Sequence, residues 1–167
     1  MNSIRVDPQL QALLPTETVM EILAHTHEKQ DRALILIQSE DEIVKRTQEP
    51  IFVVDDDQGI LESFDVMLGD DYKLVMANDG NLALQLLNRH KPDLLFLDLQ
   101  IPGPDGLEVL THIRQKGLMT RVVVVTAMVQ EEYQKRAEQL GVYRYLNKPL
   151  DVDEIMEIAH TATHSLQ

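Results

Sequence analysis

Short apolar runs alternate with amphipathic segments from residue 51 to the end of the chain. Three of the runs are nearly continuous in Val, Ile, Leu and Phe, which is typical of parallel strands that are buried on both faces. Five runs follow one another, IFVV (51–54), YKLVMA (72–77), DLLFLD (93–98), RVVVVTA (121–127) and VYRYL (142–146).

Between the runs, apolar residues recur with the spacing of one helix face, as in Ile60, Phe64 and Met67 or in Leu107, Leu110 and Ile113. The order is therefore strand then helix, five times in about 115 residues. Strict alternation predicts an α/β fold, a doubly wound (βα)5 parallel five-stranded sheet of the flavodoxin-like kind, with helices on both faces. In such sheets, ligands bind at the carboxyl ends of the strands.

The first part of the chain, residues 1–49, has a different composition, being polar and rich in helix-favouring residues. Thr16 can cap a helix that follows Pro15, and an apolar face continues to Val44. We expect a helix of about 30 residues that ends before residue 50, although ALILI (33–37) fits a strand equally well. The chain thus divides into a helical extension or linker (1–49) and an α/β domain (50–167).

Composition removes several classes of function. The formal net charge is −13; residues 1–49 carry 5 basic and 9 acidic groups, and the other 118 carry 10 and 19. With neither part basic, no Trp and only seven Tyr and Phe, direct binding to nucleic acid is disfavoured. The lack of cysteine excludes thiol nucleophiles and zinc–thiolate sites. No signal peptide or membrane-spanning run is visible, so we expect a cytoplasmic protein that does not bind membranes.

Acidic residues end two of the predicted strands. Asp55, Asp56 and Asp57 follow the first run, and Asp98 ends the third. Adjacent carboxylates repel one another, and a hard cation such as Mg2+ would relieve that repulsion. A solvated loop, with Asp57 as the cap of the next helix, explains the first group equally well.

A hydroxyl and an ammonium group are expected at the same sheet edge. Thr126 ends the fourth run, and Lys148 follows the fifth, next to a proline that favours an extended chain. Acids, a hydroxyl and a lysine at the ends of four strands indicate phosphoryl chemistry, since cations and hydrogen-bond donors stabilise phosphoryl oxygens. Asp98 would then be the nucleophile, because carboxylates can form aspartyl phosphates.

Residues 51–164 resemble the receiver domain of the two-component response-regulator family. The matching motifs lie 28 residues apart from Asp98 to Thr126 and 22 apart from Thr126 to Lys148. They occur in the family's order over about 115 residues: VVDDD (53–57), LLFLD with PGPDG (94–106), VVVVTA (122–127) and YLNKP (145–149).

The resemblance implies a phosphoacceptor and a metal site. Asp98 would accept a phosphoryl group from a sensor histidine kinase or a phosphotransfer protein. Asp55, Asp56 and Asp98 would bind Mg2+, with the backbone carbonyl of Gln100 as a further ligand. Such a protein is a phosphoacceptor regulator rather than an enzyme, and only self-phosphorylation from phosphodonors and slow self-dephosphorylation are expected of it.

The resemblance also implies a switch. Thr126 and Lys148 would hold the phosphoryl group, and the ring of Tyr145 would turn inward when Thr126 engages it. The change would be felt at the fourth helix, fifth strand and fifth helix of the domain, where a downstream protein or a second copy could bind. In the family, the position of Gln100 varies and influences dephosphorylation. Met128 offers no group to orient an attacking water, so we expect a long-lived phosphoryl state.

Three alternatives remain open from the residues. The domain could be a scaffold that is never phosphorylated, although all its motif positions are filled. It could be a phosphatase with an aspartyl nucleophile, although such enzymes carry an Asp-x-Asp motif on the first strand. Residues 1–49 could pair with a second copy to form a homodimer, bind a partner protein, pack on their own domain, or be a severed linker.

Overall fold

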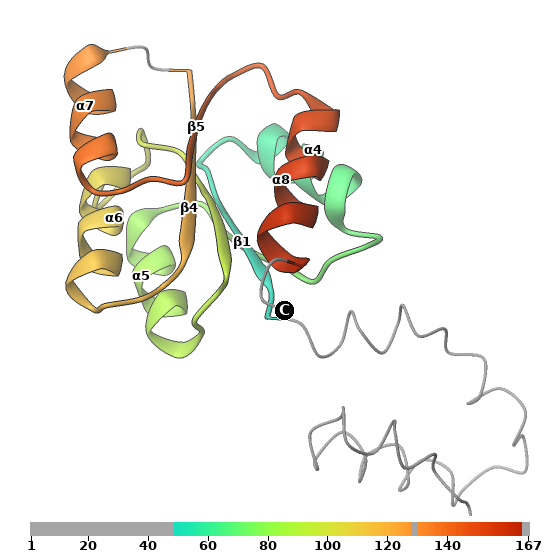
Figure 1. The fold of residues 1–167 in the computed structure, drawn as a ribbon, viewed down its shortest axis with the longest axis horizontal. Helices are drawn as coiled ribbons and strands as arrows, with labels where there is room; N and C mark the ends of the chain where they lie inside the picture. Colours follow the sequence, from blue (N-terminus) through green and yellow to red (C-terminus); the bar gives the residue numbers. More distant parts are fainter. Residues whose placement is uncertain (1–48, 128–129, 165–167) are drawn as a thin grey trace, which may run out of the picture. The chain divides into compact units, whose positions relative to one another are not determined.

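A five-stranded sheet forms the centre of the computed structural model, which describes residues 49–127 and 130–164 (Figure 1). The expected helix before Pro50, and the alternative strand at 33–37, lie outside the described residues, as does Met128. All neighbouring strands run parallel, in the order β2-β1-β3-β4-β5. The strands are β1 (Ile51–Val54), β2 (Leu74–Ala77), β3 (Leu94–Leu97), β4 (Arg121–Thr126) and β5 (Arg144–Asn147).

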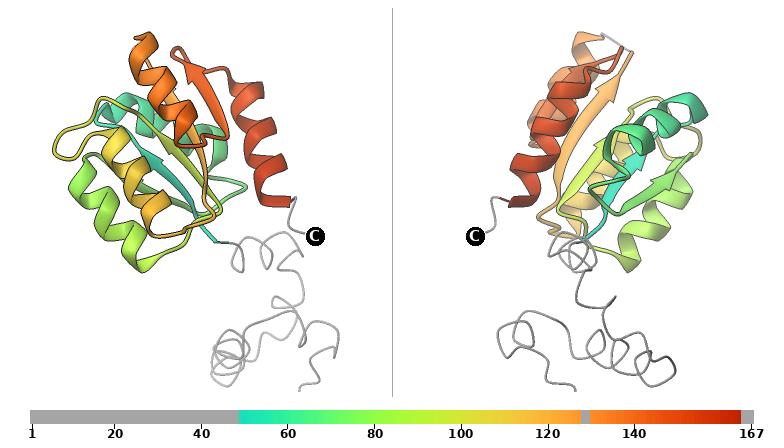
Figure 2. Two further views of the ribbon diagram at one scale, coloured as in Figure 1. Left: turned by 60° about the vertical axis from the view of Figure 1, so that its left-hand side comes forward. Right: turned by 90° about the vertical axis from the view of Figure 1, so that its right-hand side faces the viewer.

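Helices cover both faces of the sheet, which confirms the predicted doubly wound fold (Figures 1 and 2). Helices α4 and α8 pack on one face, and α5, α6 and α7 pack on the other. Their bounds are α4 (Gln58–Leu68), α5 (Gly80–Arg89), α6 (Gly106–Gln115), α7 (Glu131–Gln139) and α8 (Val152–His164). Among the described residues, no helix is both long and apolar enough to cross a membrane.

The alternation of side chains along each strand divides the core into two layers. On β1, Ile51 and Val53 belong to the layer under α4 and α8, whereas Phe52 and Val54 belong to the layer under α5, α6 and α7. All four are buried, as are the four residues of β3. Burial on both faces explains why these strands appear in the sequence as continuous apolar runs rather than as alternating ones.

Two strands, β2 and β5, begin two residues after the start of their apolar runs, 72–77 and 142–146. The run 72–77 contributes only Leu74–Ala77 to the sheet. The N–H of Tyr72 donates instead to the carbonyl of Leu68, at 2.8 Å, and so closes the turn after α4. The end of a helix thus uses a backbone donor that the pattern alone assigns to a strand. Asp57 caps α4 as expected, since its carboxylate accepts from the N–H of Gly59 at 2.8 Å.

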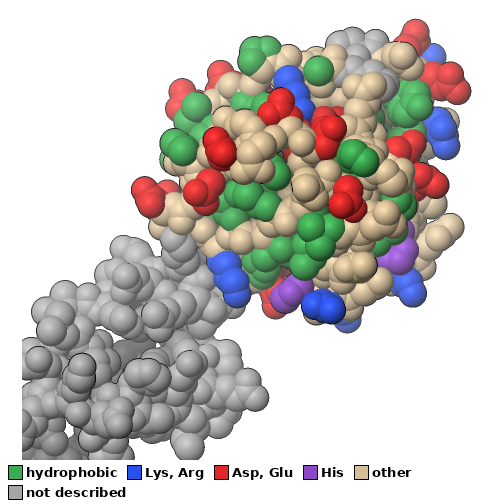
Figure 3. All heavy atoms as spheres, turned by 180° about the vertical axis from the view of Figure 1, so that it is seen from behind, with side chains coloured by type: hydrophobic (Ala, Val, Ile, Leu, Met, Phe, Trp, Pro, Cys, Tyr) green, Lys and Arg blue, Asp and Glu red, His purple; other side chains and the backbone are tan. Residues whose placement is uncertain are grey.

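Charge is distributed unevenly along the strand direction. Basic residues stand at or just before the start of several strands, as Lys73, Lys91 and Arg121 do, whereas Asp55 and Asp98 follow strand ends. On the face shown in Figure 3, acidic side chains gather over the upper part, and histidines and several basic side chains lie along the lower rim. The electrostatic potential is therefore more negative at the carboxyl edge of the sheet, and a cation is attracted there.

An arginine at the end of α6 ties together the loops at the opposite edge. The guanidinium of Arg114 donates to the carbonyls of Leu140 (2.8 Å) and Gly141 (2.9 Å), which follow α7. It also donates to the carbonyls of Thr120 (3.2 Å) and Leu118 (3.4 Å), which precede β4. One planar group with several fixed donors thus satisfies four backbone acceptors that no helix or strand pairs.

A second arginine holds α8 in a similar way. Arg121 begins β4, and its guanidinium donates to the carbonyl of Ala162 near the end of α8, at 2.7 Å. Its guanidinium carbon also lies 5.9 Å from the ring centroid of Tyr143, in the segment between α7 and β5. Both helices that flank β5 are therefore anchored to the body of the domain at their carboxyl-terminal ends.

We expect Arg114→Lys to lower the free energy of unfolding by about 2 kcal/mol, because lysine keeps the charge but cannot reach four carbonyls at once. Urea unfolding would measure the change. Lys135→Ala is the matched control, since it removes only an exposed pair with Glu131 and costs under about 0.5 kcal/mol. An Arg114→Lys variant as stable as the control would contradict this role for Arg114.

Candidate functional site

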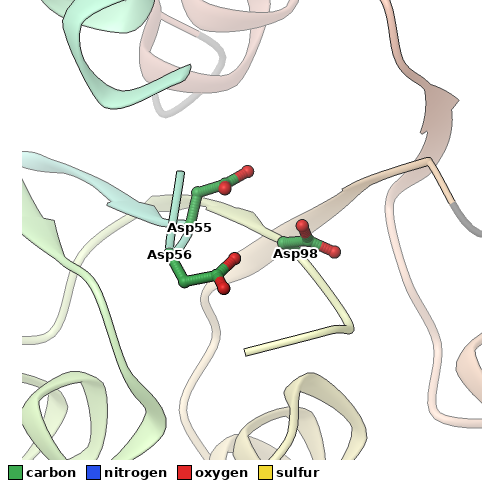
Figure 4. Close-up of side chains that lie close together, drawn as sticks. All are labelled: Asp55, Asp56 and Asp98. Carbon is green, nitrogen blue, oxygen red and sulfur yellow. The ribbon is translucent and has the colours of Figure 1, made fainter. Parts of the chain in front are cut away.

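Three carboxylates meet at the carboxyl edge of the sheet. Asp55 and Asp56 directly follow β1, and Asp98 directly follows β3, its neighbour in the sheet. Figure 4 shows the three side chains close together, and one oxygen from each lies within 4.8 Å of the others. Asp55 and Asp98 are buried, with 2% and 6% of their surface exposed, while Asp56 is exposed. Parallel strands that end at one edge bring these residues together.

Lys148 reaches the same cluster from the end of β5. Its Nζ lies 2.6 Å from Oδ2 of Asp55 and 2.9 Å from Oδ2 of Asp98. Burial alone would lower the pKa of this ammonium group, but its hydrogen bonds to Asp55 and Asp98, and their charges, outweigh that effect and raise the pKa. Lys148 is therefore a fixed positive charge placed between two buried carboxylates.

The buried position of Asp55 is costly for its charged form. Desolvation raises the pKa of its carboxyl above the usual range. The hydrogen bond from Lys148 opposes that shift, and so does the N–H of Asp57, which donates to Oδ1 of Asp55 at 2.9 Å. The negative charge of Asp98 adds to the rise. The charged form of Asp55 is thus disfavoured by burial and by the charge of Asp98, and a further cation beside it would stabilise that form.

Asp98 is held by contacts on both of its carboxylate oxygens. Oδ2 accepts from Lys148, and Oδ1 accepts from the backbone N–H of Gln100 at 3.0 Å. Gln100 therefore belongs to the loop that wraps the acceptor carboxylate. Whether its carbonyl binds a metal stays a prediction.

Thr126 and Tyr145 lie on the strands beside Lys148. Thr126, the last residue of β4, is buried, and its carbonyl accepts from the N–H of Lys148 at 3.0 Å. Tyr145, on β5, is half-buried against the layer that contains α7. Burial raises the pKa of its phenol, and the charges of Asp98 and Glu138 raise it further. The role of Tyr145 as a switch stays a prediction.

The donor set fits a divalent cation. All side-chain candidates are carboxylate oxygens, which hard divalent cations prefer, and the three acids exceed the single positive charge of Lys148. A divalent cation would offset the remaining two negative charges. This arrangement is compatible with divalent-metal binding.

Sequence reasoning missed one close backbone contact at the site. Gly106, the first residue of α6, donates its N–H to the carbonyl of Leu99 at 3.0 Å. A Cβ atom at Gly106 would lie 2.4 Å from the backbone oxygen of Asp98, so only glycine fits there. The PGPDG segment contains this glycine, but its composition indicates only a turn, and not what the turn packs against.

Comparison with known proteins identifies the class of domain that this fold and site define. The model of the response regulator receiver domain family matches residues 51–160, and the chain belongs to that family. Members of this family are regulators rather than classical enzymes. The cluster of Asp55, Asp56 and Asp98 fits the phosphoacceptor site of a receiver domain of two-component signalling.

Among curated proteins, the chain is 34% identical over 110 residues to sporulation initiation phosphotransferase F of Bacillus subtilis, covering 65% of this chain and 89% of that protein. It is 35% identical over 106 residues to the alkaline phosphatase synthesis transcriptional regulatory protein PhoP of the same organism, and 33% identical over 118 residues to the DNA-binding transcriptional regulator NtrC of Salmonella typhimurium. These matches cover 63% and 70% of this chain. The chain spans only 44% and 25% of the length of those two regulators.

Solved structures of receiver domains and response regulators have the same fold as this chain. The receiver domain of an HD domain-containing protein from Pseudomonas fluorescens Pf-5 matches with a TM-score of 0.66 and 31% identity, covering 71% of this chain and 98% of that one. The Mn(2+)-bound form of response regulator Rcp1 matches with a TM-score of 0.63 and 26% identity, covering 71% and 97%.

We expect Lys148→Ala to destabilise the metal-free protein by about 3 kcal/mol, because two buried carboxylates would lose the ammonium group that contacts both of them. Added Mg2+ should then raise the melting temperature of the variant more than that of wild type, since it would supply the missing charge. Thermal unfolding in EDTA and in Mg2+ measures both effects, with Lys135→Ala as the control. Equal gains from Mg2+ in the variant and in wild type would contradict the role of Lys148 as the counter-charge.

Proposed function

We propose that this chain is a phosphorylation-dependent signalling module that accepts a phosphoryl group on Asp98. The donor would be a phosphohistidine of a sensor histidine kinase or of a phosphotransfer protein. One observation carries the proposal: a single lysine is shared between Asp98 and Asp55 inside an acidic cluster at the sheet edge. A purely structural ion pair does not need the second and third carboxylates.

The transfer itself is a displacement at phosphorus. A carboxylate oxygen of Asp98 forms the new P–O bond as the P–N bond of the phosphohistidine breaks. The imidazole nitrogen keeps the electron pair of the broken bond and gains a proton from solvent. Mg2+ held by Asp55, Asp56, Asp98 and the Gln100 carbonyl would supply positive charge to the phosphoryl oxygens.

Lys148 and Thr126 would hold the phosphoryl group once it is formed. The ammonium of Lys148 already contacts Oδ2 of Asp98, so it lies beside the place where the new oxygens arise. Thr126 ends the adjacent strand, and a hydroxyl there can donate a hydrogen bond to a phosphoryl oxygen. Phosphorylation would thereby pull on the ends of β4 and β5.

That pull would be read at the surface formed by α7, β5 and α8. Tyr145 lies on β5, three residues before Lys148, and is half-buried against the layer that contains α7, which supports its role as the switch. Large apolar side chains are exposed on or beside these elements, namely Tyr143 (40%), Val152 (51%) and Met156 (43%). We infer that a downstream protein, or a second copy of the chain, binds this surface when Asp98 is phosphorylated.

Residues 1–49 would act as a helical extension or linker beside the receiver domain of residues 50–167, and pairing through the extension is a second route to a homodimer. The chain would be a phosphoacceptor rather than an enzyme, with self-phosphorylation from phosphodonors and slow self-dephosphorylation as its only reactions. The cytoplasmic location and the lack of nucleic-acid binding stay predictions. The match to NtrC, a DNA-binding regulator, covers only 25% of that protein, so its DNA binding is not carried over to this chain.

Intact-mass measurement after treatment with acetyl phosphate and Mg2+ tests the proposal. We expect wild type to gain one phosphoryl group and Asp98→Asn to gain none. Asp105→Asn is the matched control, because it neutralises another acid of the same loop while its amide oxygen can still cap α6. No gain in wild type would favour the scaffold alternative, and a gain in Asp98→Asn would place the acceptor elsewhere.

The lifetime of the phosphoryl group is a separate expectation. Gln100 is exposed two residues after the acceptor, and its amide is a poor base for activating water. We therefore expect the acyl phosphate to persist for longer than seconds after the donor is removed. Following the decay by intact mass would test this, with the urea-denatured phosphoprotein as the control for intrinsic hydrolysis. A half-life of seconds would show that the folded site does promote hydrolysis.

A further inference from the structure

The loop that carries Gln100 is supported from outside by the start of α5. This loop runs from residue 99 to residue 105, between β3 and α6. The N–H of Gly80, the first residue of α5, donates to the carbonyl of Pro102 in the loop, at 2.9 Å. Gly80 is buried at this contact. The loop is therefore hydrogen-bonded to a helix that contributes none of the three acidic side chains.

The packing at this contact leaves no room for a side chain. A Cβ atom at Gly80 would lie 1.8 Å from the carbonyl oxygen of Pro104 and 2.8 Å from its carbonyl carbon. Both are backbone atoms, so a change of rotamer cannot relieve the clash. Gly103, in the same loop, has φ of +77°, and a Cβ there would lie 2.8 Å from Nδ2 of Asn81. The loop and the first turn of α5 thus fit closely, through backbone atoms at Gly80 and through the side chain of Asn81 at Gly103.

The other side of the loop is tied to the phosphoacceptor. The N–H of Gln100 donates to the carboxylate of Asp98, and Gly106 packs against the backbone oxygen of Asp98. Only one residue separates Pro102 from Gln100, and one separates Pro104 from Gly106. A displacement of Pro102 and Pro104 would therefore also move the backbone that contacts Asp98. The geometry links the start of α5 mechanically to the metal and phosphoryl site.

The first turn of α5 is itself rigidly placed. Oδ1 of Asp79 accepts from the N–H of Leu82 at 2.8 Å and so caps the helix. Ala83 and Leu87, on the same helix, are buried in the layer that also contains Val54 and Leu97. A helix capped and packed in this way can serve as a fixed support for the loop.

We propose that Gly80 is a positioning residue for the cation and phosphoryl site, acting through the loop that carries Gln100. The inference rests on the proposed function, because it concerns the same site. Gly80 touches neither the metal nor the phosphoryl group; it sets how closely the loop approaches α5 and, through that, where the loop's end stands beside Asp98.

The test compares Mg2+ affinity between glycine variants of the full chain. We expect Gly80→Ala to raise the Kd for Mg2+ at least about tenfold, measured by calorimetric titration at a temperature where the variant is folded. The rate of phosphorylation by acetyl phosphate at saturating Mg2+ should fall as well, because Asp98 is displaced too.

Gly117→Ala is the matched control. Gly117 has φ of +65°, so alanine strains the backbone and lowers stability, but nothing lies within 4 Å of the added Cβ. Gly117 follows α6 and stands outside the loop that carries Gln100. A variant that is destabilised at this place should keep the wild-type Kd for Mg2+, so a merely structural effect of Gly80→Ala would be recognised by comparison.

A second pair of variants serves if Gly80→Ala fails to fold. Asp79→Ala and Asp79→Ser both remove one negative charge, but serine keeps an oxygen that can cap α5. A support that depends on the first turn of α5 predicts a Kd for Mg2+ several-fold higher in Asp79→Ala than in Asp79→Ser. Equal Kd values in this pair would overturn the inference.

The outcomes separate this inference from the proposed function. If wild type binds no Mg2+ and gains no phosphoryl group, the proposed function fails. If wild type and Gly117→Ala bind Mg2+ and are phosphorylated, and Gly80→Ala matches them in Kd and rate, the proposed function stands and the positioning role of Gly80 is wrong. A higher Kd in Gly80→Ala alone supports both.

Discussion

The repulsion between buried carboxylates at the carboxyl edge of the sheet is the constraint on which the site depends. Asp55 and Asp98 are both withdrawn from water, and a single ammonium group, that of Lys148, lies within 3 Å of each. Such a cluster is unfavourable by itself, because desolvation and mutual repulsion both oppose its charged form. A bound cation would offset the excess negative charge, so the repulsion between the carboxylates favours the binding of positive charge at this edge of the sheet.

The parallel sheet makes this concentration of charge possible. Strands β1 and β3 are buried along their whole length, and β4 along nearly all of it. Four strand ends therefore bring their polar residues to the same edge of the sheet, namely Asp55 and Asp56, Asp98, Thr126 and Lys148. The two apolar layers give the strands no freedom to slide, since a shift of one residue would exchange the faces of Ile51 and Phe52. The rigidity of the core is thus what allows acidic side chains to be held together against their repulsion.

Much of this was predictable from the sequence, and the reason for the remainder is physical. Apolar runs that are followed by Asp, Thr or Lys predict both a buried strand and a polar sheet edge. The fold and the grouping of Asp98 with Asp55 could therefore be predicted from the pattern. The beginning of β2 could not, because the N–H of Tyr72 completes a helix end instead. Contacts made by backbone atoms were also invisible: the four carbonyls held by Arg114, and the carbonyl that Gly80 approaches, carry no residue signature.

The anchoring of α7 and α8 has a consequence for how a signal can spread. Arg114 fixes the loop that follows α7, and Arg121 fixes the last turns of α8, both at the edge remote from the acids. When a helix is held at one end, a tilt moves each residue by an amount that grows with its distance from that end. A tilt of either helix would therefore be smallest near the arginines and largest at the amino-terminal end of the helix, at the carboxyl edge of the sheet. A partner that distinguishes two states of the domain would therefore discriminate best by binding the amino-terminal ends of α7 and α8.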